Sequence, residues 1–488
     1  GPVAEILEAE MRDLDPDFFS DLKIKLKIIS KEGHTLNGYV DAIGNTWGGG
    51  KYARERLKQT EWLGHCLLHP SQENLSRILL WLDGHSNPVP GDWLELMQQL
   101  GELPESAFIN RYLDRLGERV SQSPDAWQDL LNEVQEQLRK KTYSLTRLSP
   151  AINWLEQHRP EHHQIPKPLR LQWLSARLAN SNHLGQLDKP AIQEILELGN
   201  QLLDECAPEV AQAWLRVSVA ATNAMDFAAA KAVLEPMQDL PNSAIGLSNR
   251  GKYWSSLGQI SAFQHQHKEA IAYFDRALET FARLSDPEEA AREQFQTRSY
   301  KLIATMDDPD QSDSSVQTEL ESLGKGGLAA ILLSLAPCGD ETRWLHHLVL
   351  RAMNVRRNLG QGYMDQYLQR AHDWQGGSHH PWPLIDAYRA MWLIEKDQRQ
   401  QAIDHLNTAI ENADEGHDAP ILTWMSNVLR ALGASLGLCS GPLEDQTPPV
   451  ADPEQAENLK QARLQLETAK TPEQRLCTLE RCLPFNFH

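Results

Sequence analysis

The sequence predicts an all-α protein in which an α-solenoid of stacked helical hairpins follows a mainly helical N-terminal domain. Two observations support this prediction. Apolar residues recur at the three- and four-residue spacing of amphipathic helices along most of the chain. Between residues 243 and 285, small residues also occur where two antiparallel helices must approach closely. Such a hairpin cannot bury its apolar face alone, so neighbouring hairpins are expected on both sides.

Length and composition limit the classes of protein to consider. A chain of 488 residues is too long for one compact core, which predicts several domains or an elongated array. Hydrophobic residues make up 41% of the chain, and no apolar run approaches the roughly 18 residues of a membrane span. The six cysteines are scattered, which predicts a reducing, cytoplasmic environment without a disulfide framework. A net charge of −20 disfavours general nucleic-acid binding, because such binding uses basic residues against phosphates.

Residues 1–165 show no repeat and are expected to form the N-terminal domain. Within it, residues 23–43 allow two interpretations. Their period-two alternation and the Asn37-Gly38 turn predict a small β-hairpin, whereas their apolar residues also share one helical face. Apolar stripes that include Trp93 and Trp127 predict helices further along, and a connector rich in proline and histidine ends the domain.

A glycine-rich loop at 44–50 directly precedes a predicted helix with basic residues in its first turns. Lys51, Arg54 and Lys58 are therefore candidates for binding an anion, because a glycine loop that leads into a helix N-terminus can surround a phosphate. The spacing differs from a P-loop, since Tyr52 follows the lysine. An ordinary flexible connection is the alternative, and these basic residues also support a local nucleic-acid site as a further alternative.

No motif predicts a metal site, a cofactor or catalysis. His65 and His69 share a helix face, but Cys66 stands where a zinc protease of this spacing needs glutamate. The paired His379 and His380 lie in a glycine-rich loop, which favours a solvated turn. A cysteine protease joined to helical repeats stays an alternative, although no cysteine lies in a pattern that would activate its thiolate.

The region 166–440 is expected to contain the hairpins. Residues 169–180 pair with 190–203, and 208–223 pair with 226–237. In the next hairpin the spacing resembles the tetratricopeptide repeat, which implies a superhelix with a concave surface that holds a peptide or a partner helix. Trp254, Leu257, Gly258, Ala270, Phe274 and Ala277 match that repeat, whereas Ser261, His265 and Ala282 replace its Tyr, Gly and Pro.

A weaker copy of the same pattern lies further along the chain. Ala390, Leu393, Ala402 and Leu406 fit it, whereas Asp386 and Arg389 replace the expected apolar pair, and degenerate repeats are expected in between. Residues 307–315 predict a solvated loop, and 328–335 predict a short buried helix. The region 441–488 is expected to hold a proline-rich linker around Pro448 and two capping helices.

These features predict a non-catalytic scaffold, adaptor or regulatory subunit. The resemblance places Ser255 and Gln259 on the inner face, where a clamp for a C-terminal carboxylate would need Lys and Asn, so that particular activity is not expected. Arg356 and Arg357 form a local basic spot, and the acidic second half favours a basic or amphipathic partner. A protease substrate or inhibitory cap, cut near Asp310 or Pro448, stays a further alternative.

Overall fold

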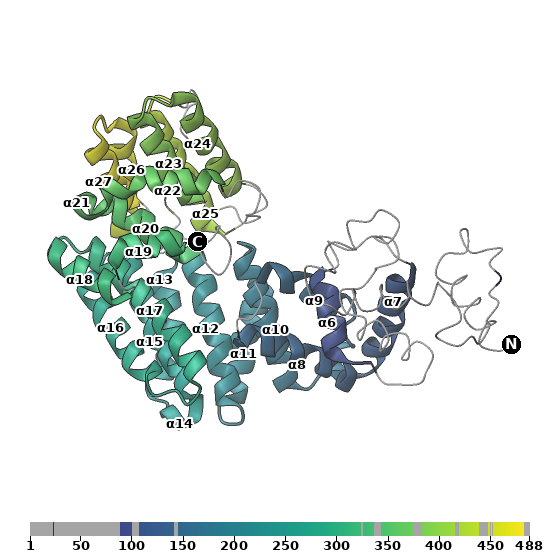
Figure 1. The fold of residues 1–488 in the computed structure, drawn as a ribbon. Coiled ribbons are helices and arrows are strands. Elements are labelled where there is room, and N and C mark those ends of the chain that lie inside the picture. Colours follow the sequence, from purple (N-terminus) through teal and green to yellow (C-terminus); the bar gives the residue numbers. More distant parts are fainter. Residues whose placement is uncertain are drawn as a thin grey trace, which may run out of the picture. The chain divides into compact units, whose positions relative to one another are not determined.

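The computed structural model describes residues 23, 88–99, 107–140, 145–323, 326–335, 343–373, 383–414, 419–438, 448, 450 and 452–482. All secondary-structure elements in these residues are helices, which confirms the all-α prediction for this part of the chain (Figure 1). None of these helices combines the length and the apolar character needed to cross a membrane. The chain divides into two compact units, one of Gly1–Arg139 with Thr146–Ile165, the other of Lys140–Leu145 with Pro166–His488.

Tryptophan rings form the core of the first unit. Trp93 and Trp127 are fully buried, and the Trp93 and Trp154 ring centroids lie 5.4 Å apart. The Nε1 of Trp127 donates to the Leu155 carbonyl at 3.0 Å, so its polar atom is satisfied inside the core. The helices of this unit are α6 (Pro90–Gln99), α7 (Ala107–Gln122), α8 (Pro124–Lys140), α9 (Leu145–Gln157) and the 3-10 turn η2 (His162–Gln164).

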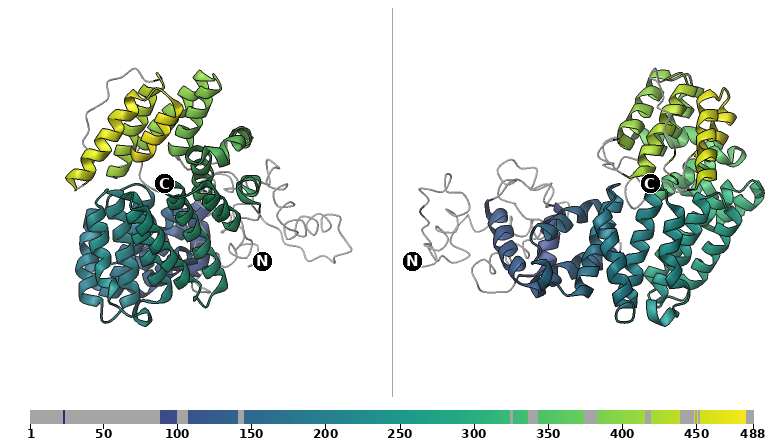
Figure 2. Two further views of the ribbon diagram at one scale, coloured as in Figure 1. Left: turned by 90° about the vertical axis from the view of Figure 1, so that its left-hand side faces the viewer. Right: turned by 180° about the vertical axis from the view of Figure 1, so that it is seen from behind.

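Three antiparallel hairpins open the second unit. Their first helices lie side by side, since α10 contacts α12 and α12 contacts α15 (Figure 2). Asp188 and Asp226 cap the second helices of the first two hairpins through backbone N–H groups, which fixes where these helices begin. The helices are α10 (Lys167–His183), α11 (Lys189–Leu202), α12 (Ala207–Asn223), α13 (Phe227–Gln238), α14 (Asn242–Ile245), α15 (Leu247–Phe263) and α16 (His267–Phe281).

A residue in the left-handed backbone conformation recurs in the turns that follow several helices. Gly185, Met225 and His265 have φ values of 64°, 58° and 59° and follow one another at equal intervals along the chain. Asp397 and Gly437, separated by that same interval, have φ values of 59° and 67°. In all five turns the next N–H donates to the carbonyl five residues earlier, at 2.8 to 2.9 Å. This bond is the mark of a Schellman motif, so the five turns share one backbone conformation.

Small residues bring the paired helices together as expected. A Cβ built on Gly258 would lie 2.7 Å from the Phe274 ring, so α15 approaches α16 at a distance that only glycine permits. Ala270, Phe274 and Ala277 of α16 are fully buried, and Leu257 is 5% exposed. The small residues in the sequence pattern therefore lie at the contact between the two helices.

The helices that follow in the second unit vary in length, from the 21 residues of α17 to the 4 residues of α21. The predicted short buried helix is present as α19, with Leu328 and Leu332 buried. The helices are α17 (Pro287–Asp307), α18 (Asp313–Leu323), α19 (Gly327–Ser334), α20 (Arg343–Val355), α21 (Arg357–Gly360), η3 (Gln361–Tyr363), α22 (Met364–Asp373), α23 (Pro383–Glu395), α24 (Arg399–Asp414), α25 (Pro420–Ser435), α26 (Pro453–Thr468) and α27 (Pro472–Cys482).

The last helices of the chain pack back against earlier ones. Helix α25 contacts α12, and α27 contacts α20. The Ala419 N–H donates to the Gly185 carbonyl in the α10–α11 turn at 3.0 Å, and the Trp424 Nε1 donates to the Cys482 carbonyl at 2.9 Å. Residues far apart in the sequence therefore meet inside this unit, and one such meeting forms the candidate site described below.

The acidic segment 307–315 corrects one expectation. It is not a long solvated loop, because α17 extends to Asp307, α18 begins at Asp313, and Asp308 between them is only 3% exposed. Asp310 is exposed at the tip but pairs with Lys268 at 2.8 Å. Pro448, the second suggested cleavage position, is buried.

Other expectations fall where the structure gives no description. The possible β-hairpin at 23–43 lies outside the described residues except for Lys23, so both interpretations of that segment stay predictions. The same holds for the glycine-rich loop at 44–50, for His65 and His69, and for the histidine pair at 379–380.

Candidate functional site

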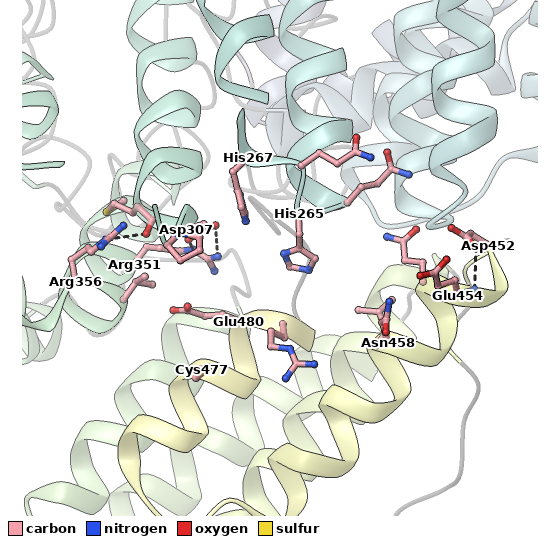
Figure 3. A pocket seen from close by; sticks show the side chains of 18 residues that line it. His265, His267, Asp307, Arg351, Arg356, Asp452, Glu454, Asn458, Cys477 and Glu480 are labelled. Atoms are coloured by element: carbon pink, nitrogen blue, oxygen red, sulfur yellow. Dashed lines mark hydrogen bonds and ion pairs between the residues drawn. The ribbon is translucent and has the colours of Figure 1, made fainter. Parts of the chain in front are cut away.

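A polar cleft of about 830 Å³ opens inside the second unit (Figure 3). One wall is the turn between α15 and α16, and the opposite wall consists of α26 and α27 near the end of the chain. The C-terminal end of α17 and the helix α20 form the floor between them. The lining is rich in ionisable and amide side chains, so the cleft is suited to recognising polar groups.

Two histidines project from the first wall. His265 occupies the left-handed turn position, where the tetratricopeptide pattern would have glycine, and His267 begins α16. Their ring centroids lie 5.9 Å apart. The Nδ1 of His267 is buried and has no hydrogen-bond partner. Loss of hydration lowers the pKa of His267 below its ordinary value, an effect that Asp307 and Asp308 partly oppose, so its imidazole is neutral at pH 7.

A buried ion pair lies on the floor of the cleft. The Nε and Nη2 of Arg351 donate to the two carboxylate oxygens of Asp307, at 3.0 and 2.5 Å. The two side chains are only 3% and 9% exposed. Burial alone would lower the pKa of Arg351, but the Asp307 carboxylate outweighs it, and the net shift is upward. The remaining nitrogen, Nη1, is buried outside these two bonds, and the buried Tyr388 hydroxyl interacts with the same guanidinium.

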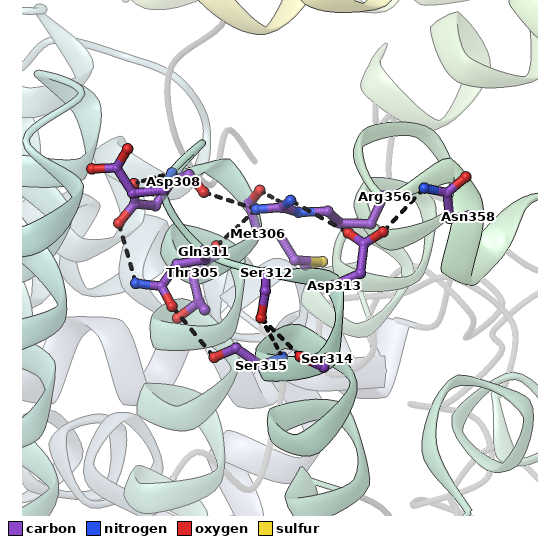
Figure 4. A network of polar contacts seen from close by, with 11 residues as sticks. Thr305, Met306, Asp308, Gln311, Ser312, Asp313, Ser314, Ser315, Arg356 and Asn358 are labelled. Atoms are coloured by element: carbon purple, nitrogen blue, oxygen red, sulfur yellow. Dashed lines mark hydrogen bonds and ion pairs between the residues drawn. The ribbon is translucent and has the colours of Figure 1, made fainter.

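Arg356 has an internal role at the end of α17 (Figure 4). Its guanidinium donates to the carbonyls of Met306 and Asp308 at 3.0 and 2.8 Å, and it contacts the Asp313 carboxylate at 3.4 Å. These carbonyls belong to the helix terminus, where no intrahelical donor is available. Arg356 therefore joins α20 to the α17–α18 turn and has little capacity left for a partner.

The opposite wall contributes an unpaired carboxylate. Glu480 of α27 is half-buried, and its Oε1 is buried with no hydrogen-bond partner. Burial is the main cause that raises the pKa of Glu480, to about 8, and the nearby Asp307 adds to the shift while Arg351 and Arg356 oppose it. Cys477 is exposed one turn earlier on the same helix, and Asp452 and Glu454 lie at the start of α26.

The lining of the cleft offers several hydrogen-bonding groups to a ligand. The described residues contain no group of three or more side chains that could hold a metal ion. Cys477 makes no hydrogen bond with a histidine among the contacts of the described residues, and a thiol needs such a neighbour to become a reactive thiolate. Unpartnered donors and acceptors instead indicate that a ligand could satisfy them.

The predicted site residues do not come together in this cleft as a group. Ser255 is 8% exposed in α15, and Gln259 is half-buried one turn later. Arg356 lines the cleft but is occupied as described, and the side chain of Arg357 lies outside the described residues. The candidate anion-binding residues Lys51, Arg54 and Lys58 also lie outside them, so all these assignments stay predictions.

Sequence patterns missed most of the cleft. His265 left a signal, because it replaces the turn glycine of the repeat, and a residue held in an unfavourable conformation often has a functional reason. Glu480 left none, since it is one of many acidic residues on amphipathic helices. Its proximity to Asp307 depends on how α27 docks against α20, which no local spacing predicts.

Comparison with known proteins adds no relative: no family model, curated protein or solved structure matches this chain.

Proposed function

We propose that this chain is a non-catalytic binding protein, an adaptor or regulatory subunit, built on a tetratricopeptide-like α-solenoid. The observation that supports it most is the repeated turn at Gly185, Met225 and His265, whose positions are evenly spaced in the sequence. Identical turns at equal intervals, with first helices side by side, are the arrangement expected of stacked hairpins. Proteins of that architecture generally act through their extended surfaces.

One face of the first helices is available for such contacts. Leu215 and Ser255 occupy equivalent positions in successive hairpins and are only 7% and 8% exposed. The equivalent pair one turn later, Val219 and Gln259, is more accessible, with Val219 41% exposed. An exposed apolar side chain beside a polar one suits a protein partner, so Gln259 is the better of the two inner-face candidates.

The charge of the chain indicates which partner to expect. The net charge is −20, and acidic residues outnumber basic ones in both 301–350 and 401–450. Charge complementarity accelerates encounter with a basic or amphipathic partner and disfavours acidic ones. The proposed partner is therefore a protein or peptide with basic side chains on its contact face.

Affinity capture from the native host tests this proposal. The tagged chain should retain a specific protein partner, and Gln259→Arg should reduce its recovery by placing a bulky cation on the proposed contact face. Gln401→Arg, on the exposed surface of α24, is the matched control and should leave recovery unchanged. Equal recovery with both variants would count against the α15 face, and capture of no partner would count against the adaptor function.

The alternative of an enzymatic role predicts a measurable activity of the same purified protein. A cysteine hydrolase would turn over a peptide pool and lose that activity in Cys477→Ala, the only exposed cysteine among the described free ones. We expect no turnover in either protein. Activity that disappears with this single substitution would replace the proposed function.

A further inference from the structure

The positive charges that line the cleft already have partners. Arg351 is engaged by Asp307 through two hydrogen bonds, and Arg356 is held by carbonyls at the end of α17. Arg481, at the edge, donates to the Gln465 side chain at 2.9 Å. A second anion bound here would therefore have to compete with contacts that the protein itself provides.

The carboxyl groups of the cleft are less fully engaged. Glu480 has a buried oxygen without a partner, and Glu454 lies on the neighbouring helix α26 of the same wall with Asp452, whose carboxylate caps that helix. The ends of α15, α17, α20 and α27 at the cleft are C-terminal ends, which carry partial negative charge, whereas only α16 and α26 present N-terminal ends. The helix ends therefore add mainly negative potential to the cleft, and Glu480, whose pKa is about 8, is mostly a neutral carboxylic acid at pH 7 until a cation binds.

We propose that the cleft binds a cationic side chain of a partner peptide, with its guanidinium or ammonium group on the Glu480 carboxylate. This inference rests on the proposed function and names the chemistry of the partner. A cation with several N–H donors would satisfy the buried Oε1 and offset the cost of ionising the Glu480 carboxyl there. A charge-assisted pair in a partly dehydrated cleft is also stronger than the same pair at an open surface.

One further unpartnered atom favours a peptide over a free amine. The Nδ1 of His267 can pair with a main-chain N–H or carbonyl, depending on its tautomer. A basic side chain together with its main chain therefore matches what the cleft leaves unsatisfied.

Peptides that differ only in the central side chain give a sharp test. Short acetylated and amidated peptides carry Arg, citrulline or Glu at the centre of otherwise identical mixed flanks, and their affinities for the full chain are measured by calorimetry. Citrulline has the shape of arginine without its charge, so the Arg peptides should bind about tenfold or more tightly than the citrulline peptides. Agmatine, which has the guanidinium group without a peptide, should bind more weakly than the Arg peptides.

Substitution of the carboxylate identifies the site. In Glu480→Gln the preference for Arg over citrulline should disappear, whereas Glu411→Gln, an exposed carboxylate on α24 away from the cleft, should keep it. Thermal unfolding of both variants establishes that they are folded. Because the carboxyl group is largely protonated below pH 8, the glutamine side chain closely resembles the native state at pH 7.

Proton release provides a readout on the unmodified protein. The free carboxyl has a pKa of about 8, but the bound cation requires the carboxylate, so binding at pH 7 should release close to one proton. Affinity for the Arg peptides should rise about tenfold per pH unit up to pH 8 and then level off. Other titratable or charged groups face Glu480 from the neighbouring elements, namely His265, His267, Asp307, Arg351, Arg356, Tyr388, Asp452, Glu454, Cys477 and Arg481.

Each outcome separates the cleft from the wider function. Equal affinity for Arg and citrulline peptides, or an Arg preference that survives Glu480→Gln, would overturn the cleft assignment. If affinity capture still recovers a partner in that case, the adaptor proposal stands without it. If agmatine binds as tightly as the Arg peptides, the ligand of the cleft is not a peptide. If, in addition, no partner is captured, the adaptor function is overturned as well.

Discussion

The hairpins α15–α16 and α23–α24 share one backbone plan but hold their helices together with different chemistry. In the first hairpin, Trp254 lies eleven residues before the turn residue His265, and Tyr273 lies eight residues after it. Their rings stack with centroids 5.9 Å apart. The same two positions in the second hairpin have Asp386 and His405, whose Oδ1 and Nδ1 atoms lie 2.8 Å apart. Arg389 adds a contact of 3.4 Å to the same carboxylate.

This difference shows which positions the fold constrains. Ala270 and Ala402, at the closest approach of the helices, are both alanine and fully buried. The pair nearer the surface is half-buried in both hairpins, so either an aromatic stack or a charged hydrogen bond can occupy it. Steric fit is therefore constant, and the chemistry of the outer pair varies.

The largest effect is expected where the two hairpins agree. Phe274 and Leu406 are equivalent and are 0% and 1% exposed. Phe274→Ala should lower the free energy of unfolding by about 3 to 5 kcal/mol, because it removes a buried ring and leaves a cavity. Chemical denaturation measures this loss, and Leu333→Ala, at a side chain that is 69% exposed, is the control with little change. A loss below about 1 kcal/mol would contradict the packing described here.

In the hairpin α23–α24, stability should depend on the Asp386 carboxylate. Replacement by alanine removes the acceptor for His405 and Arg389, and the expected cost is about 1.5 to 3 kcal/mol of unfolding free energy. Combining Asp386→Ala with His405→Ala in a double-mutant cycle isolates the pair from other losses. Additive effects of the two substitutions would show that the hydrogen bond contributes nothing to stability.

Close approach in the apolar hairpin is tested by adding one methyl group. Gly258→Ala would place a Cβ 2.7 Å from the Phe274 ring and should destabilise the protein by about 1 to 3 kcal/mol. Gly362→Ala is a suitable control, because a Cβ there meets no atom within 4 Å. If both substitutions have the same effect, Gly258 is not required for helix contact.

The smallest effect is expected at the turns, and it should be a gain. His265 and Asp397 adopt φ values of 59°, which disfavour most side chains but suit glycine. His265→Gly should raise the unfolding free energy by about 0.5 to 1 kcal/mol, and Asp397→Gly should raise it less, because aspartate tolerates this conformation better. Unfolding midpoints of the two variants, measured in parallel, check which substitution stabilises more. A larger gain in Asp397→Gly than in His265→Gly would contradict the prediction.

Local patterns predicted the helical class and the best hairpin well. Helical spacing is a local property, and the close contact of Gly258 with Phe274 spans few residues, so both leave a signal in the sequence. The segment 307–315 was predicted correctly only at its centre, where Pro309, Asp310 and Ser312 are exposed, because its many acidic residues suggest hydration throughout. The carboxylate of Asp307 is instead buried by Arg351, 44 residues later.

The cleft was beyond local prediction for a similar reason. It joins a turn near residue 265 to helices near residues 455 and 480, and the docking of α27 against α20 is a long-range contact. His265, as a departure from the repeat, and Arg356, as part of a basic spot, were the residues that pointed toward it. Asp386 was noticed only as a mismatch and its partner His405 was not noticed, since a pattern of apolar residues does not describe a polar replacement.

The equal spacing of the first three turns has a consequence for how such a chain could change in length. Helices α10, α12 and α15 begin at Lys167, Ala207 and Leu247, so the segment from one such start to the next is a complete module with matching ends. Duplication or deletion of one such segment in the gene would keep the conformation of the other turns and add or remove one whole hairpin. Insertion or loss of whole hairpins would lengthen or shorten the exposed face without changing the contacts between the remaining hairpins.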